Sequence, residues 1–269
     1  MGQIIEFPDI KNGKEKILEL RKSLENYILE RDYLQFVVCE NIGTSYMLIF
    51  GSLEYRIYES YCRYLRLHRK KELIQAKINR GEKANMDVIE SKLDEEFIEY
   101  KKKLEEKIFE INRAIERSKF ETLNEEESAQ LKKLYRGIVK SLHPDLNPSI
   151  SNGEKELFYK AADSYEQGDI CTLQIIYEIV QGTENREDVP LSNSSLGKEI
   201  ERLENLVEEI QKDIETIKTN PPYTWKIYID DEEKRTKKLN ELTADLKSFE
   251  EGIRTQEEYI ESLMRDSHE

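Results

Sequence analysis

The apolar residues of this chain recur in steps of three and four, and this spacing constrains the fold more than any other feature. An α-helix has 3.6 residues per turn, so such steps place apolar side chains along one helical face. Gly (11) and Pro (6) are scarce among the 269 residues, so few positions interrupt a helix. Charged residues make up 36 % of the chain, a fraction that disordered chains also reach, but the regular spacing argues against disorder. We therefore expect an all-α fold.

These apolar helical faces, which we call seams, divide the chain into segments. The spacing predicts helices over residues 14–31, 44–80 and 87–119, and two seams over 196–217 and 239–263, separated by Pro221-Pro222. We expect an N-terminal helical bundle or coiled-coil arm over 1–120, a linker over 183–195, and a C-terminal antiparallel coiled-coil hairpin over 196–269. Periodicity equally allows the same seams to pair between copies of the chain, so a homo-oligomer is an alternative.

Charge and cysteine content exclude some classes of protein. The net charge of −14 repels phosphate backbones, which makes general nucleic-acid binding unlikely. Three widely separated cysteines, Cys39, Cys62 and Cys171, indicate reduced thiols and a cytoplasmic location instead of a disulfide framework. The N-terminus has no secretion signal, and the apolar runs are too short to span a bilayer, so we expect no membrane association.

Residues 121–182 differ from the seams, because they predict three short helices. In the first of these, Asn124 and Glu127 form a capping box, and apolar residues make one stripe. Gly137 lowers the stability of this helix by about 1 kcal/mol relative to alanine, which suggests a role in close packing. A basic face runs along another side of the helix and suits an acidic surface; its residues are Lys132, Lys133, Arg136 and Lys140.

A loop with the sequence His143-Pro144-Asp145 follows this helix. Pro144 cannot continue a helix, and it pushes His143 towards extended backbone geometry. We expect His143 at the exposed start of the loop, with Asp145 as an acceptor for backbone donors or a partner's cation. A rigid loop of this kind lowers the ordering cost of docking on a partner.

The segment Tyr135–Pro148, Tyr-Arg-x-x-Val-Lys-x-Leu-His-Pro-Asp-Leu-Asn-Pro, resembles the second helix and loop of J-domain (DnaJ-like) co-chaperones. Phe158, Ala161, Ser164 and Tyr165 are similar to that family's third helix, so the resemblance covers about a quarter of the chain. It implies docking on a DnaK-type (heat-shock-70) chaperone and stimulation of that partner's ATP hydrolysis. It assigns the ATPase-stimulating tripeptide to His143, Pro144 and Asp145, and the docking surface to the basic face.

The chain departs from the family in two respects. The usual first helix, with Tyr-x-x-Leu-Gly-Val, is missing just upstream, and we expect the end of the 87–119 helix to pack in its place. The Gly/Phe-rich linker and Cys-x-x-Cys zinc repeats of general-purpose members are also missing. The resemblance therefore implies a specialised, non-enzymatic co-chaperone, similar to uncharacterised bacterial J-domain proteins with flanking coiled coils that select a client or location. A structural coiled-coil adaptor with the J-like segment as scaffold is the alternative.

Three other features allow more than one interpretation or exclude a class of site. The tyrosine-rich and basic stretch 55–71 is suited to nucleic acid by composition, but it also fits a helix that packs its aromatics and exposes its charges. Tyr223, Trp225 and Tyr228 form either a client or partner patch, or a contact with the chain's own helices. The three histidines, His68, His143 and His268, lack metal-ligand spacing, and no catalytic or cofactor motif is present, so we expect no metal, cofactor or enzymatic activity.

Overall fold

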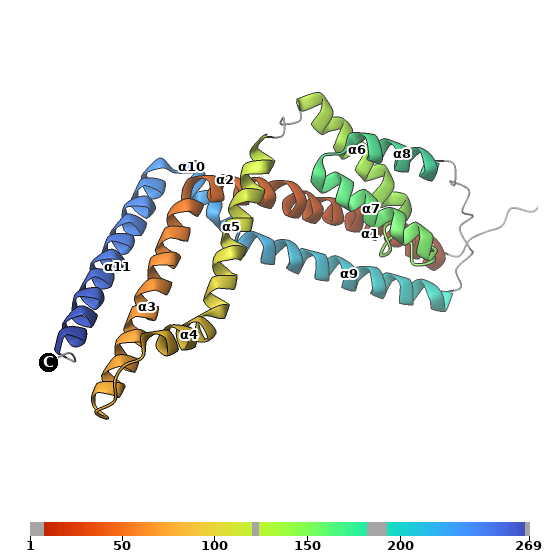
Figure 1. Cartoon of the computed structure of the whole chain (residues 1–269). Coiled ribbons are helices and arrows are strands. Elements are labelled where there is room, and N and C mark those ends of the chain that lie inside the picture. Colours follow the sequence, from red (N-terminus) through yellow and green to blue (C-terminus); the bar gives the residue numbers. More distant parts are fainter. Residues whose placement is uncertain (1–7, 120–123, 182–192, 267–269) are drawn as a thin grey trace, which may run out of the picture. The chain divides into compact units, whose positions relative to one another are not determined.

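A computed structural model describes residues 8–119, 124–181 and 193–266. Throughout these residues the elements are helices, and none is a strand, which confirms the all-α fold class (Figure 1). The chain divides into two compact units, and each combines an N-terminal with a C-terminal part of the sequence. Unit 1 comprises residues 1–41 and 121–224, and unit 2 comprises residues 42–120 and 225–269.

Unit 1 contains a long helical pair and a group of three shorter helices. Helix α1 (Pro8–Tyr33) lies along α9 (Asn193–Thr219), as Figure 1 shows. A π-helical turn, η1 (Leu34–Cys39), follows α1. Helices α6 (Glu125–Leu142), α7 (Asn152–Gln167) and α8 (Ile170–Gln181) pack on one another. Apolar side chains from all these elements share one core, which includes Leu24, Ile28, Ile138, Leu173 and Leu203.

Unit 2 is organised around a second helical pair. Helix α2 (Glu40–Tyr46) leads through the π-helical turn η2 (Met47–Gly51) into α3 (Ser52–Ile78). Helices α4 (Met86–Glu96) and α5 (Ile98–Lys119) pack on α3. After the short helices η3 (Tyr223–Trp225) and α10 (Lys226–Asp230), the chain forms α11 (Glu232–Asp266), which lies along α3.

These pairings correct two predictions from the sequence. The two C-terminal seams do not form a hairpin with each other, because α9 packs on α1 and α11 packs on α3, in different units. The predicted arm over 1–120 is likewise divided between the two units. Periodicity identifies the apolar face of each helix but not its partner, and here each seam pairs with a helix far away in sequence. Most of the predicted linker 183–195 lies outside the described residues.

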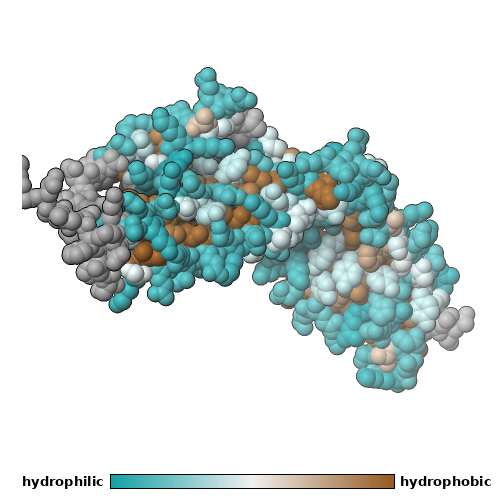
Figure 2. Space-filling model, turned by 180° about the vertical axis from the view of Figure 1, so that it is seen from behind, coloured by the Kyte–Doolittle hydropathy of each residue, from teal (hydrophilic) through white to brown (hydrophobic). Residues whose placement is uncertain are grey.

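The helical stretch Asn12–Ile78 includes a window that is long and apolar enough, by length and composition, to cross a membrane. From the sequence we expected no apolar run long enough to span a bilayer. The core helix of a soluble protein and a signal sequence near the N-terminus pass the same test, and 28 % of the window is buried in this structure. Figure 2 shows a face that is mostly hydrophilic, with smaller hydrophobic areas among the hydrophilic residues.

Candidate partner-docking site

Helix α6 begins and packs as its sequence predicts. The Asn124 side chain accepts a hydrogen bond from the Glu127 backbone, and the Glu127 carboxylate accepts one from the Asn124 backbone, which completes the capping box. The apolar stripe is buried, and its residues are Leu131, Leu134, Ile138 and Leu142. The four residues of the basic face, Lys132, Lys133, Arg136 and Lys140, are exposed. Helix α6 therefore has one face for the core and another open to solvent.

Gly137 allows α6 to approach α8 closely. A Cβ atom at this position would lie 2.3 Å from Cε2 of Tyr177, much closer than real Cβ contacts. The low helix propensity of glycine is thus offset by a close contact that a larger residue prevents.

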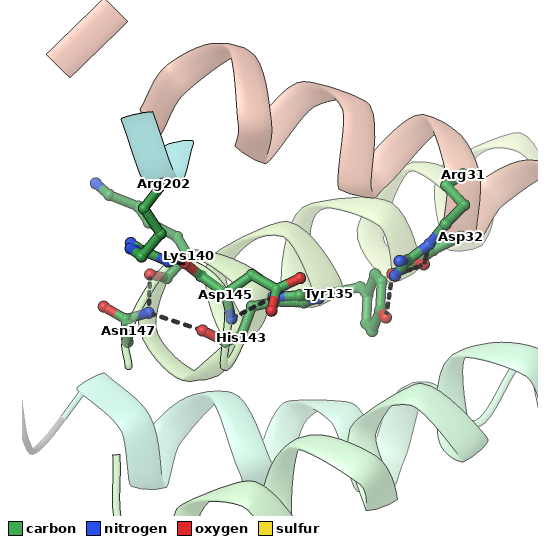
Figure 3. A network of polar contacts seen from close by, with 8 residues as sticks. All are labelled: Arg31, Asp32, Tyr135, Lys140, His143, Asp145, Asn147 and Arg202. Atoms are coloured by element: carbon green, nitrogen blue, oxygen red, sulfur yellow. Dashed lines mark hydrogen bonds and ion pairs between the residues drawn. The ribbon is translucent and has the colours of Figure 1, made fainter. Parts of the chain in front are cut away.

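The His-Pro-Asp loop, residues 143–151, is ordered by its own hydrogen bonds (Figure 3). His143 has the predicted extended backbone, with φ −65° and ψ 127°. Its carbonyl accepts the backbone N–H groups of Leu146 and Asn147 at 3.1 and 2.9 Å. The Asn147 side chain donates to the Lys140 carbonyl at 2.9 Å and so ties the loop to the end of α6. Ser151 then caps α7 in a second capping box.

The His143 side chain is buried, with 5 % of the residue exposed, so the prediction of an exposed histidine is wrong. Its ring packs edge-on against Phe158 of α7, with centroids 4.9 Å apart. Its Nδ1 accepts the Asp145 backbone N–H at 3.1 Å, so the neutral ring carries its proton on Nε2. Burial lowers the pKa of His143, and the nearby Asp145 carboxylate only partly opposes this.

Pro144 and Asp145 are the half-exposed members of the tripeptide. The Asp145 side chain is 37 % exposed, and its backbone carbonyl accepts a hydrogen bond from Arg202 of α9 at 3.0 Å. Glu199 holds the Arg202 guanidinium through two hydrogen bonds of 2.8 and 2.9 Å. The bond from Arg202 lowers the pKa of Glu199, which therefore stays ionised beside the loop.

A buried polar network joins α6 to α1. The Tyr135 hydroxyl donates to the Asp32 carboxylate at 2.7 Å, and Asp32 also accepts from Arg31 at 2.7 and 2.9 Å (Figure 3). Burial and the adjacent carboxylate raise the pKa of Tyr135 far above its ordinary value. The Tyr135 ring stacks on Tyr165 of α7 with centroids 4.1 Å apart, and burial raises the pKa of Tyr165 to about 12. Tyr135, the first residue of the segment that resembles J-domain proteins, is therefore a core residue.

Helix α1 also contacts the basic face. Arg136 Nε lies 3.0 Å from the Glu25 carboxylate, and the Lys132 ammonium lies 4.2 Å from the centroid of the Tyr33 ring. We expected the end of the 87–119 helix to replace the missing first helix, but α5 belongs to unit 2, and α1 occupies a face of α6 instead. Glu25, Asp32 and Arg202 were not predicted, because they lie outside the motif in sequence and have no local pattern that marks them.

The other candidate residues do not join this site. Along 56–71 the cations pair with acids of unit 2, such as Arg63 with Glu257 at 2.6 Å, and Tyr61 and Tyr64 pack on Phe249 of α11. This arrangement favours the structural interpretation of that stretch over nucleic-acid binding.

The predicted patch of Tyr223, Trp225 and Tyr228 is not one exposed cluster. All three residues are half-buried. Tyr223 packs on the core of unit 1, whereas Trp225 stacks on Tyr46 in unit 2 with centroids 4.2 Å apart. The structure therefore favours contact with the chain's own helices.

Within the described ranges, no group of three or more His, Cys, Asp or Glu side chains is arranged to hold a metal ion. Comparison of the chain with protein-family models, with curated proteins and with solved structures found no match. The resemblance to J-domain proteins therefore rests on the sequence pattern of residues 135–165 alone.

Proposed function

We propose that this chain is a non-enzymatic, J-domain-type co-chaperone that docks on a DnaK-type chaperone and stimulates ATP hydrolysis by that partner. One observation carries the proposal: an exposed basic face on α6 leads directly into an ordered His-Pro-Asp loop. The cations suit an acidic partner surface, and the preorganised loop lowers the entropy lost on docking. We place the protein in the cytoplasm, with its long helical pairs selecting the client or location.

Burial of His143 assigns different tasks to the three loop residues. The His143 ring holds the loop through Phe158 and the Asp145 backbone, whereas Pro144 and the Asp145 carboxylate are accessible to a partner. We infer that Asp145 meets the partner and that His143 maintains the loop conformation that presents it.

The test is single-turnover ATP hydrolysis by a DnaK-type chaperone in the presence of the full chain. We expect the hydrolysis rate to rise with the wild type and to return to the basal rate with Asp145→Asn, which removes the charge at nearly constant shape. Lys237→Met, a charge change at an exposed position of α11 in unit 2, serves as the matched control and should stimulate like the wild type. No stimulation by the wild type at any concentration would contradict the proposal.

The second candidate is a structural adaptor in which the J-like segment is scaffold. The observation that favours it is the burial of Tyr135 and His143, which contribute to the core of unit 1. It predicts that Asp145→Asn leaves all partner binding unchanged, whereas Ile210→Asp in the buried α1–α9 seam abolishes it.

A further inference from the structure

The contacts of α1 fall on the same residues that form the proposed docking surface. Arg136 donates from Nε to Glu25 at 3.0 Å and from a terminal nitrogen to Asn26 at 3.4 Å. Lys132, one turn earlier on α6, lies over the Tyr33 ring. Lys133 and Lys140, also on the basic face, have no ion pair with α1 in the described part of the chain.

The Glu25 carboxylate occupies the Nε edge of the Arg136 guanidinium. Its side chain is 16 % exposed, whereas that of Arg136 is 56 % exposed, so the acid is enclosed and the cation stays accessible. Arg136 makes one charge-assisted hydrogen bond to Glu25, from Nε, and such bonds are stronger than those between neutral groups. An acidic docking partner must therefore compete with Glu25 for Arg136.

Helix α9, which packs along α1, also contacts the His-Pro-Asp loop. Arg202 bonds the Asp145 carbonyl, Glu199 holds Arg202, and Arg21 of α1 reaches Glu199 at 3.4 Å. The buried bond between Tyr135 and Asp32 anchors α1 beside α6 and keeps Glu25 near the basic face. The competing carboxylate is thus held in place by contacts that do not involve the basic face.

We propose that α1 is an intramolecular competitor for the docking surface, and that a DnaK-type partner docks by displacing Glu25 from Arg136. This inference rests on the proposed function. The pair is partly exposed, and such pairs change an equilibrium by about two- to five-fold. The contact therefore reduces partner affinity modestly and does not block docking.

The experiment uses the full chain and measures the concentration that gives half-maximal stimulation of ATP hydrolysis by a DnaK-type chaperone. Glu25→Gln removes the competing charge and should lower this concentration by about two- to five-fold. Asn26→Asp adds a carboxylate beside Arg136 and should raise it. Opposite shifts from two isosteric changes cannot both come from a damaged fold. Glu19→Gln makes the same charge change at an exposed position of α1 and should have no effect.

The outcomes separate this inference from the proposed function. If all variants stimulate hydrolysis with the same half-maximal concentration, the competition by Glu25 is contradicted but the co-chaperone proposal is not. A higher half-maximal concentration for Glu25→Gln also contradicts the competition, because it means that Glu25 assists docking. The absence of stimulation by every variant, Glu25→Gln included, overturns both.

Discussion

His143 illustrates how burial changes the role of a motif residue. The sequence places it before Pro144 with an extended backbone, and the structure has that backbone. Its side chain, however, is buried edge-on against Phe158 and accepts a hydrogen bond from the Asp145 backbone N–H, so the ring stabilises the loop from inside. The backbone could be predicted from a neighbour in sequence, whereas burial depends on Phe158, fifteen positions later and on another helix.

The pH dependence of stability tests the burial of His143. Burial lowers the pKa of His143 from its ordinary value of 6.5, so below that pH the unfolded chain binds more protons than the folded one. The free energy of unfolding must therefore fall as the pH drops through 6.5 towards the lowered pKa. Urea unfolding at about pH 7.5 and about pH 5.5 should show a larger acid loss for the wild type than for His143→Gln. Equal losses would mean that His143 is not buried in its neutral form.

At the scale of single elements, local signals predicted helix ends and one close contact. The capping box of Asn124 and Glu127 begins α6 where the sequence predicts, and Gly168, with φ 73°, ends α7. Gly137 was predicted to serve close packing, and Tyr177 lies against it. These features depend on residues a few positions apart, or on the unusual choice of glycine within a helix. Their partners on other helices were not predictable.

Gly137→Ala should destabilise the protein although alanine is the better helix former. The gain in helix propensity is about 1 kcal/mol, but overpacking against the Tyr177 ring costs about 1–3 kcal/mol. Gly153→Ala in α7, where a Cβ meets open space, is the matched control and should stabilise by up to about 1 kcal/mol. Urea unfolding measures both, and stabilisation of similar size by both substitutions would contradict the close approach of α6 and α8.

Helix α11 has a second element-scale contact that can be tested. The Lys238 ammonium lies 4.5, 4.9 and 5.5 Å from the ring centroids of Tyr228, Tyr46 and Phe50. Cation–π contacts at partly desolvated sites contribute about 1–2 kcal/mol, so Lys238→Met should lower the free energy of unfolding by that amount. Its neighbour Lys237 is 77 % exposed, and Lys237→Met should change stability little. If the two variants have the same free energy of unfolding, the contact of Lys238 with the three rings does not stabilise unit 2.

At the scale of the whole molecule, each unit joins segments from opposite ends of the chain. The α1–α9 and α3–α11 pairs link helices that lie far apart in sequence. Seam periodicity predicted that these helices are amphipathic, and this is confirmed by the burial of Leu24, Leu203 and Ile253. It could not predict their partners, because any two apolar faces of similar length satisfy the same pattern. The contact between Asp32 and Tyr135, 103 positions apart, could not be predicted either, because no local pattern links the two residues.

The central claim is that α6 and the His-Pro-Asp loop are the surface that meets a DnaK-type chaperone. Amide hydrogen exchange of the full chain, with and without the ATP-loaded partner, tests it most directly. We expect slower exchange in residues 132–147, with unchanged exchange in α11. Asp145→Asn should remove this protection. Unchanged exchange in residues 132–147 at saturating partner, or protection confined to α3 and α11, would contradict the claim.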